Sequence, residues 1–490
     1  MVKRFFEAEW SFIGVVVFFI THGYSQNLFL VPLPALFMLL AILLAAALAL
    51  FFIAKKVFRN TTKATLFASF VLILILFFGA MQEFLVQYRF THLLGRLVVL
   101  VPLSLLAMLL FFIFLKRTKR TFTRTIIYLN VLLLVYILID TGVIIAGITK
   151  YTDQRKPPVG KNGWPACDTC SKPSVYLVML DSYFGSEGMR RYFNYDNRDF
   201  ENYLQSEGFQ INKGSLSNYT FTVFSIASTF NMDYLRDPGS ITYNNHYAYT
   251  QATRALQYNK VMAFFAAQGY TINNYSSFDM SGLPAYHSSE LLPDKIRLIT
   301  KQTMFYRVNK YLGPFLIRKG WLSPEKMEEE YIGTMEEMMQ KVLNGSSTDK
   351  GRPDFTYLHL MMPHGPYVFD SLGNRMINGS VSATGSSYDP HEQFLQYQVY
   401  TNRKISGFIS QLKQKTGGKA AILLMSDHGY RPSFKMDRKL SYCNLNALYL
   451  PRQNYSGWYD GISNVNQFRV LFNALYGENL PLLKDSMVVQ

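Results

Sequence analysis

The sequence predicts an α/β protein in two parts: an N-terminal multi-span α-helical membrane domain and a C-terminal domain with a mostly parallel sheet flanked by helices. Leu, Phe, Val, Ile and Ala dominate residues 1 to about 150, whereas the remainder has an ordinary globular composition. In that remainder, short apolar runs typical of buried strands alternate with helix-like segments. We therefore expect a transmembrane domain at 1–150, a linker at 151–173 and an exported domain at 174–490.

Five apolar segments are candidates for membrane-spanning helices, at about 10–26, 31–54, 64–84, 94–115 and 126–148. The last four are long enough to cross about 30 Å of hydrocarbon as helices. The first is weaker, because His22, Ser25 and Asn27 interrupt its end. If it lies in the membrane interface instead, four crossings remain.

Basic residues flank these segments unevenly. Lys3 and Arg4 precede the first segment, and basic loops at 55–63 and 116–124 follow the second and the fourth. Cytoplasmic loops are enriched in Lys and Arg, so the N-terminus and both loops are predicted to be cytoplasmic. Five crossings then place the C-terminal domain on the extracytoplasmic, or periplasmic, side of a cell (inner) membrane.

The formal net charge of +16 does not indicate a nucleic-acid partner. Much of the excess lies in the loops between membrane segments, where it faces anionic lipid, and the rest is spread without a basic run. Cys167 and Cys170 form a C-x-x-C pair with no further zinc ligands nearby, so a local disulfide or two free thiols are both open. Cys443 is expected to be a packing residue.

The C-terminal domain begins with the apolar strand 175–181 and continues as an alternation of helices and strands. Gly208, Gly269 and Gly345 are expected to end helices, as Gly commonly does. Further strands are expected at 270–275, 354–362 and 420–426, and helices at 189–208, 222–236, 250–268, 324–344 and 392–415.

Polar side chains follow several of these strands. Asp181 ends the first strand, His364 follows the strand 354–362, and Asp427 and His428 end the last strand. Thr222 lies at the expected N-terminus of a helix. Because ligands bind beyond the carboxyl ends of strands in open α/β sheets, we expect these residues to converge.

The chemistry of this set is that of a metal-assisted group transfer. Carboxylate oxygens and an imidazole suit one divalent metal ion, Zn²⁺, Mn²⁺ or Mg²⁺. A coordinated Thr hydroxyl can lose its proton and act as a nucleophile, and a helix N-terminus favours an anionic phosphoryl or sulfuryl group. His364 could bind a nonbridging oxygen or protonate the leaving alkoxide.

Each of these residues also has a purely structural interpretation. An Asp at a strand end is often a cap, Asp-His-Gly can be a turn, Thr in a Ser/Thr-rich segment is commonly a helix N-cap, and a His before Gly-Pro is commonly a loop residue. Their joint occurrence at one edge of a plausible sheet favours a functional site.

Over residues 174–450 the chain resembles the sulfatase-like branch of the alkaline phosphatase superfamily. Ser426-Asp-His-Gly is the strongest motif. His359-Leu-Met-Met-Pro-His364-Gly-Pro is similar to the H-x-x-G-S-H-G-P segment of lipid A phosphoethanolamine transferases, and Tyr400-Thr-Asn to their Tyr-Thr-Asp segment. A membrane-helical N-terminus with an exported catalytic domain is also similar to lipoteichoic acid synthases.

The resemblance implies an alkaline-phosphatase-like catalytic domain with one divalent metal ion. It implies Thr222 as the covalent nucleophile, with Thr220 as the alternative, and His364 as a substrate-binding or acid/base residue. We add His359 and Asn218 as substrate contacts. The implied metal ligands are Asp181, Thr222, Asp427 and His428.

The chain departs from the family pattern at two places. Formylglycine sulfatases carry C/S-x-P-x-R, whereas residues 222–226 read Thr-Val-Phe-Ser-Ile, so sulfate-ester hydrolysis is not expected. Ser182 follows Asp181 where many sulfatases have a second Asp, and the transferases place a Glu there. One fewer carboxylate favours a single metal ion.

The sequence thus predicts a membrane-anchored, metal-dependent phosphotransferase. It would move a phospho-head group from a membrane lipid donor to a glycan or lipid acceptor, such as a glycolipid, through a phospho-threonine intermediate. A phosphodiesterase or sulfatase-like hydrolase would use the same site with water as acceptor. A non-catalytic exported binding module is the alternative from another class, and it predicts no metal.

Overall fold

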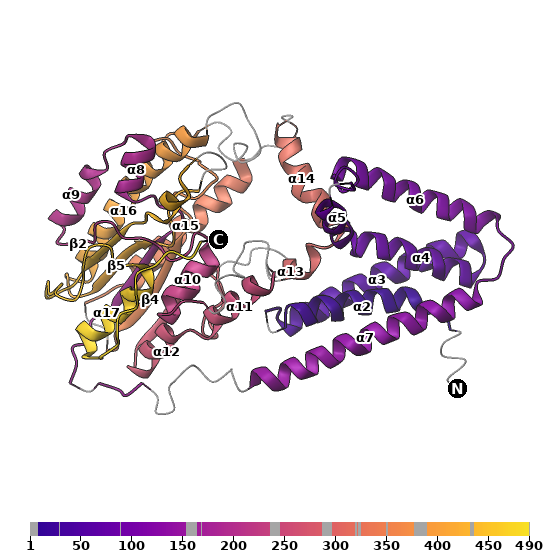
Figure 1. Cartoon of the computed structure of the whole chain (residues 1–490), viewed down its shortest axis with the longest axis horizontal. Coiled ribbons are helices and arrows are strands. Elements are labelled where there is room, and N and C mark those ends of the chain that lie inside the picture. The colour runs from indigo at the N-terminus through magenta and orange to yellow at the C-terminus, as the bar shows by residue number, and fades with distance from the viewer. Residues whose placement is uncertain are drawn as a thin grey trace. The chain divides into compact units, whose positions relative to one another are not determined.

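The computed structural model forms two compact units, a helical unit of Met1–Asp153 with Ser288–Lys319 and an α/β unit of Gln154–His287 with Gly320–Gln490 (Figure 1). Most of the predicted linker lies outside the described residues. The structure describes residues 8–28, 30–88, 90–152, 164–167, 169–235, 246–286, 296–318, 321, 325–348, 351–376, 390–431 and 436–489.

The N-terminal segment of the helical unit is built from long apolar helices. The predicted segments fall on α2 (Ser11–Gln26), α3 (Leu33–Phe58), α4 (Thr61–Leu76) with α5 (Phe78–Gln87), α6 (Leu97–Arg117) and α7 (Thr123–Thr152). Among the described residues, Leu33–Phe58, Leu97–Arg117 and Thr123–Thr149 are long and apolar enough to cross a membrane. The pair α4–α5, bent by 57°, adds a fourth if it is one span. The helix α2 has 16 residues, so the number of crossings stays a prediction.

Two helices of the helical unit come from a distant part of the chain. The helices α13 (Arg297–Thr300) and α14 (Met304–Arg318) lie between two strands of the α/β unit in sequence, yet they pack on the N-terminal helices. Ile299 is buried and lies where a side chain at Gly23 of α2 would stand. The Gly79 N–H donates to the Gln302 carbonyl at 2.7 Å, and Arg307 pairs with Glu83. This insertion was not predicted from the sequence.

The α/β unit contains a six-stranded sheet in the order β2-β6-β5-β1-β4-β3. The central β1 (Val175–Leu180) pairs in parallel with β4 (Asp354–Leu360) and β5 (Ala421–Ser426), and β3 (Thr271–Tyr275) pairs in parallel with β4. The short strands β2 (Gln210–Ile211) and β6 (Asn446–Tyr449) add an antiparallel edge. The prediction of a mostly parallel sheet is confirmed.

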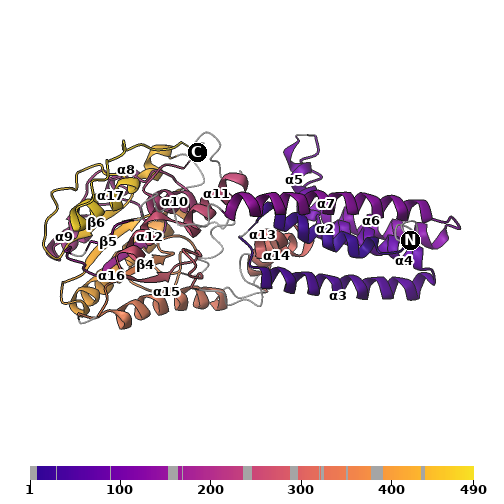
Figure 2. The same ribbon diagram turned by 90° about the horizontal axis from the view of Figure 1, so that it is seen from below.

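Helices cover both faces of this sheet (Figure 2). Alternate residues of a strand point to opposite faces, so Leu177 packs in one core cluster and Val178 in the other. The helices α10 (Thr222–Asn231), α12 (Lys260–Ala267) and α17 (Asn464–Tyr476) contribute to the first cluster, and α9 (Arg198–Ser206), α15 (Glu325–Gly345) and α16 (Pro390–Lys415) to the second.

Two predicted helices are each broken into two, which corrects the prediction. The segment 189–208 forms α8 (Ser186–Phe193) and α9, because Asn194 adopts a left-handed φ of 50° that ends α8. The segment 250–268 forms α11 (His246–Gln257) and α12, because the Asn259 side chain accepts the Met262 N–H at 2.8 Å and starts a new helix. Asn side chains compete with helix continuation in this way.

The structure distinguishes the two states that the sequence left open for Cys167 and Cys170. Cys167 and Cys170 form a disulfide, and Cys443 is a buried free cysteine.

The C-terminal segment is held to the α/β unit by Asp485. Its carboxylate accepts hydrogen bonds from the Ser463 N–H at 2.8 Å, the Ser463 hydroxyl at 2.6 Å and the Tyr459 hydroxyl at 2.7 Å. Burial alone would raise the pKa of Asp485, but the donors of Ser463, Tyr459 and Asn466 outweigh it and lower the pKa below its usual value. The ionised form is therefore stabilised on folding.

We expect Asp485→Asn to destabilise the α/β unit by about 1–2 kcal/mol at pH 7, because charge-assisted hydrogen bonds are lost. A group whose pKa is lowered on folding stabilises the folded state at pH values above its unfolded pKa, and this stabilisation is lost as the pH falls through its folded pKa. The difference in unfolding free energy between wild type and Asp485→Asn should therefore narrow below about pH 4. Thermal unfolding of the full chain in detergent at pH 7 and pH 3 measures it. Asp460→Asn, at an exposed carboxylate, is the control; an equal effect at both pH values would contradict the assignment.

Candidate metal centre and active site

Two buried carboxylates stand side by side at the carboxyl ends of neighbouring strands. The register pairs Leu180 of β1 with Ser426 of β5, so the next residues, Asp181 and Asp427, face each other beyond the sheet edge. Their exposed fractions are 1% and 0%. Two carboxylates this close and this buried require compensation of their charge.

One oxygen of each carboxylate is held by donors from the loops. Asp427 Oδ1 accepts the N–H groups of Ser182 at 3.0 Å and of His428 at 2.8 Å. Asp181 Oδ1 accepts the Ser182 hydroxyl at 2.9 Å. Ser182 makes both contacts from a φ of 63°, a conformation that non-glycine residues seldom adopt and that often marks functional sites. This arrangement leaves the Oδ2 atoms of both carboxylates for another partner.

His359 of β4 completes a buried group of potential ligands. Its Nε2 lies 3.7 Å from Asp181 Oδ2, and its ring stacks on Phe278 and Tyr357, each with a centroid distance of 5.9 Å. Neither ring nitrogen of His359 has a hydrogen-bond partner, and neither does Asp427 Oδ2. Asp181, His359 and Asp427 each offer a ligand atom, and these atoms all lie within 4.8 Å of one another.

Thr222 and His428 adjoin this group. The Thr222 Oγ1 lies 3.3 Å from His428 Nε2 and 3.4 Å from Asp181 Oδ2, at the first residue of α10. The His428 Nδ1–H donates to the Gly429 carbonyl at 2.8 Å, which leaves the lone pair on Nε2. Burial, together with the charge of Arg431, lowers the pKa of His428 to about 3.

These residues fit a divalent metal ion. His428 Nε2 and Asp427 Oδ2 lie 3.2 Å apart, and two such acceptor atoms repel each other unless a cation lies against them. Buried polar atoms without partners, carboxylate oxygens and imidazole nitrogens together are a donor set that Zn²⁺ or Mn²⁺ prefers. The predicted residues Asp181, Thr222 and Asp427 are thus brought together with His428, and His359 joins them although it was expected to contact substrate.

The remaining predicted residues lie differently. His364 is half-buried at the same edge; its N–H donates to the Asp181 carbonyl at 3.1 Å and its Nδ1–H to the Gly365 carbonyl at 2.7 Å. Asn218 is fully buried away from this group: its amide bonds Ser463, Tyr234 and the C-terminal segment. This bonding holds the loop before α10, and the substrate contact of Asn218 stays a prediction.

Sequence reasoning missed several residues of the site. The Arg431 guanidinium lies 4.6 Å from the centroid of the ring of Phe221, the residue directly before Thr222. The charge of Arg431 contributes to lowering the pKa of His428. The spacing Asp427-His-Gly-Tyr-Arg431 was the available signal. Tyr357 of β4 has a buried hydroxyl without a partner, and burial with the charges of Asp427 and Asp181 raises its pKa.

The family of the chain follows from a match to the sulfatase family model over residues 173–468. The chain belongs to the sulfatase family. This membership confirms the resemblance to the sulfatase-like branch of the alkaline phosphatase superfamily that the motifs indicated. In this sulfatase-family chain the matched region contains both strand-end carboxylates, Thr222 and both histidines of the buried group.

Solved structures similar to this sulfatase-family chain include three bacterial enzymes. The C-terminal periplasmic domain of EptC from Escherichia coli is 13% identical, with 66% of this chain and 90% of that chain covered and a TM-score of 0.39. Phosphonate monoester hydrolase of Agrobacterium radiobacter is 10% identical (62% and 74% covered, TM-score 0.38), and lipooligosaccharide phosphoethanolamine transferase A from Neisseria meningitidis is 10% identical (66% and 93% covered, TM-score 0.38). No curated protein matched the sequence.

We expect the purified full chain to hold about one divalent metal ion. Asp427→Ala should weaken the affinity of the protein for this ion at least about tenfold, because the substitution removes one ligand of the ion. Elemental analysis after dialysis against graded chelator measures both. Asp437→Ala, at an exposed aspartate, is the matched control. Equal metal content in wild type and Asp427→Ala would place the ion elsewhere.

Proposed function

We propose that this sulfatase-family chain is a metal-dependent phosphotransferase that moves a phospho-head group from a membrane lipid to a glycan or lipid acceptor. The observation that carries the proposal is the Thr222 hydroxyl at the first turn of α10, 3.3–3.4 Å from His428 Nε2 and Asp181 Oδ2 and beside the buried Asp181, His359 and Asp427 group. A hydroxyl so placed is suited to be a nucleophile.

The first half-reaction transfers the head group to the enzyme. Thr222 Oγ1 loses its proton to solvent and attacks phosphorus, and the bond between phosphorus and the lipid alcohol oxygen breaks. His364, protonated on both ring nitrogens, gives its Nε2 proton to the departing alkoxide while its Nδ1–H stays bonded to the Gly365 carbonyl. A bound divalent ion, held by Asp181, Asp427, His428 and either Thr222 or His359, would lower the pKa of the threonine hydroxyl and offset the charge of the phosphoryl oxygens.

The second half-reaction frees the enzyme. The acceptor hydroxyl attacks phosphorus while His364 takes its proton, and the bond between phosphorus and Thr222 Oγ1 breaks. The threonine oxygen recovers a proton from solvent. Water in place of the acceptor gives a phosphodiesterase with the same residues, so the acceptor alone distinguishes transfer from hydrolysis.

Two features favour an anionic phosphoryl group at this position. The N-cap residue Phe221 makes no side-chain cap, and the N–H groups of Phe224 and Ser225 donate to its carbonyl. The N–H groups of Thr222 and Val223 stay available to an anion, which the helix dipole also favours. Arg431 adds a cation beside Phe221. Residues 222–226 lack the formylglycine motif, which supports phosphoryl over sulfuryl chemistry.

A lipid donor also gives the long apolar helices a purpose. A membrane anchor confines the active site to the layer that holds the donor, which raises its effective concentration. We propose a multi-pass protein of the cell (inner) membrane with its α/β unit on the periplasmic side.

We expect Thr222→Ala to abolish the covalent adduct formed on exposure to a phospholipid donor, because no nucleophile remains. Thr222→Ser should keep it at a lower rate, and Thr220→Ala should leave it intact. Intact-mass measurement of the full chain detects the adduct and identifies the group transferred. An adduct retained in Thr222→Ala but lost in Thr220→Ala would reassign the nucleophile, and no adduct or metal with any donor would favour a binding module.

We expect the thiol of Arg120→Cys to react with a membrane-impermeant maleimide only after permeabilisation, because the loop 116–124 is predicted to be cytoplasmic. The thiol of Lys415→Cys should react in spheroplasts, because the α/β unit is proposed to lie on the periplasmic side. Both side chains are exposed in the structure, whereas Cys443 is buried and Cys167 and Cys170 are disulfide-bonded. The reverse pattern of labelling would invert the topology.

A further inference from the structure

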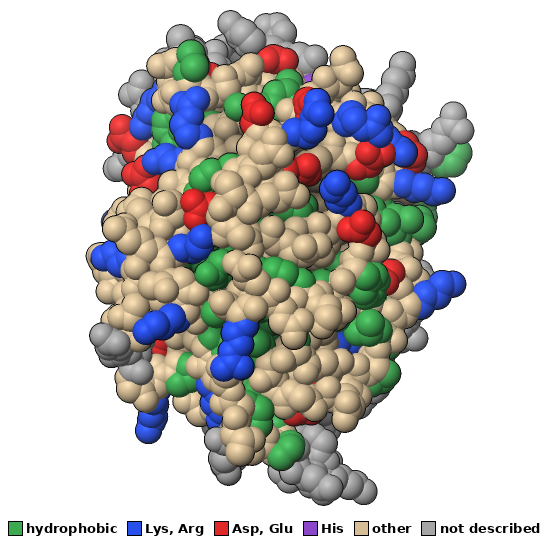
Figure 3. All heavy atoms as spheres, turned by 90° about the vertical axis from the view of Figure 1, so that its left-hand side faces the viewer, with side chains coloured by type: hydrophobic (Ala, Val, Ile, Leu, Met, Phe, Trp, Pro, Cys, Tyr) green, Lys and Arg blue, Asp and Glu red, His purple; other side chains and the backbone are tan. Residues whose placement is uncertain are grey.

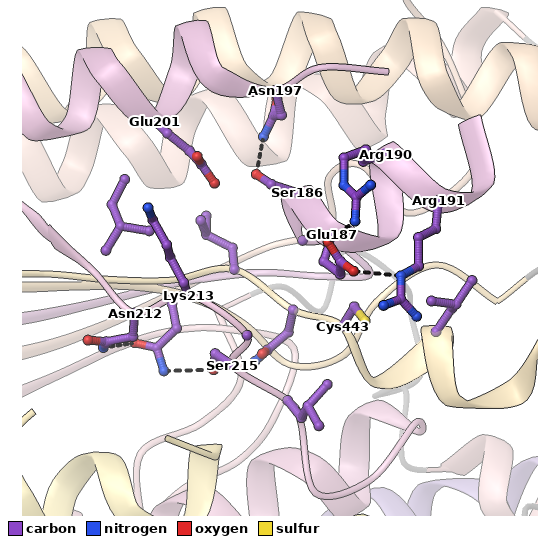
Figure 4. A pocket seen from close by; sticks show the side chains of 18 of the residues that line it. Ser186, Glu187, Arg190, Arg191, Asn197, Glu201, Asn212, Lys213, Ser215 and Cys443 are labelled. Carbon is purple, nitrogen blue, oxygen red and sulfur yellow. Dashed lines mark hydrogen bonds and ion pairs between the residues drawn. The ribbon is translucent and has the colours of Figure 1, made fainter. Parts of the chain in front are cut away.

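A cavity of about 780 Å³ lies in the α/β unit between α8, the start of α9, the turn after β2 and the segment that leads into β6 (Figure 4). Its volume is in the range of pockets that bind small molecules. The residues that line it do not include Asp181, Thr222, His359, Asp427 or His428. The cavity is therefore distinct from the metal centre.

The cavity nevertheless lies at the same edge of the sheet as the metal centre. Gly185 and Ser186 line it and follow Asp181 closely along the chain. Asn444 also lines it, just before β6, and its amide donates to the Ser426 carbonyl at 3.0 Å, next to Asp427. Because β6 is antiparallel to β5, its first residue lies at the end where β5 finishes.

Neutral polar side chains form one wall and are fixed by each other. The Asn212 amide donates to Asn446 Oδ1 at 3.0 Å, and the Asn446 amide donates to the Ser215 hydroxyl at 3.0 Å. Asn212 Oδ1 is buried and has no hydrogen-bond partner. The Ser186 hydroxyl accepts from Asn197 at 3.3 Å, so its own proton remains available to a ligand. Such a fixed set of donors and acceptors is pre-organised for a polyhydroxylated ligand.

Five basic and four acidic side chains line the cavity, which gives it a surplus of one positive charge. Arg190 and Arg191 of α8 share a single carboxylate, Glu187, at 2.8 and 2.5 Å. In Figure 4 both guanidinium groups turn toward Glu187, while Lys213 and Glu201 lie at the opposite end of the cavity. The side chains of Arg190 and Arg191 stay 66% and 59% exposed, so an anionic ligand group in the cavity can reach both. Figure 3 shows positive and negative side chains interspersed on the face of this unit.

We propose that this cavity binds a saccharide that carries an anionic group such as a phosphate. The amides, Ser186 and Glu201 would bond its hydroxyls, and the Arg190–Arg191 pair its anion. Tyr195 is the one aromatic side chain in the lining, which disfavours stacked nucleobases. The binding stands independently of the transfer reaction, whereas a role of this saccharide as the acceptor rests on the proposed function.

The test titrates the full chain in nanodiscs with N-acetylglucosamine 1-phosphate, N-acetylglucosamine and inorganic phosphate, each followed by saturation-transfer NMR. Wild type and Thr222→Ala should bind the phosphorylated sugar equally, because the catalytic hydroxyl is not involved. Arg191→Gln should weaken the phosphorylated sugar about tenfold or more and leave the neutral sugar nearly unchanged, since one charge-assisted contact is lost. Ser186→Ala should weaken both sugars about threefold.

Arg452→Gln, at an exposed arginine outside the cavity, is the matched control and should change nothing. Thermal unfolding of each variant separates lost binding from lost folding. The proposal is overturned if no sugar binds wild type, or if inorganic phosphate binds as tightly as the phosphorylated sugar. It is also overturned if binding is lost in Thr222→Ala but kept in Arg191→Gln, which would place the sugar at the metal centre. None of these outcomes depends on catalytic turnover.

Discussion

The pairing of β1 with β5 is the constraint on which the site depends. It sets Asp181 against Asp427, and the loops after both strands then hold one oxygen of each carboxylate. Two ionised carboxylates in a buried position repel each other and lose hydration, so the arrangement is stable only with compensating positive charge. His359 Nδ1 and Nε2 and Asp427 Oδ2 are buried without hydrogen-bond partners, as expected for atoms that contact such a charge.

Ser182 follows Asp181 directly and contacts both buried carboxylates. Its hydroxyl and its N–H each hold one of the two aspartates, so the residue acts as a clamp rather than as a ligand. A third carboxylate there would add another buried negative charge. Ser182 thus adds no negative charge to the buried pair of carboxylates.

The central features could be predicted from the sequence because they are local or periodic. Uninterrupted apolar runs predicted β1 and β5, and the polar residues that end these strands, Asp181, Asp427 and His428, were predicted to converge. The two broken helices could not be predicted from periodicity, since the breaks depend on the conformation of Asn194 and the cap formed by Asn259. The places of His359 and Arg431 depend on strand register and loop path, and β2 is too short to leave a pattern.

The insertion of α13 and α14 has a consequence for how the protein can be separated from its membrane. The chain passes from one unit to the other at 153, at 287 and at 319, rather than once through a single linker. A protease that cuts only the segment after α7 would therefore not shed the α/β unit. A soluble fragment that starts after residue 153 would carry α13 and α14 without their apolar partners, with Ile296 and Ile299 presented to water. The three connections between the units thus keep the α/β unit attached to the helical unit even after one of them is cut.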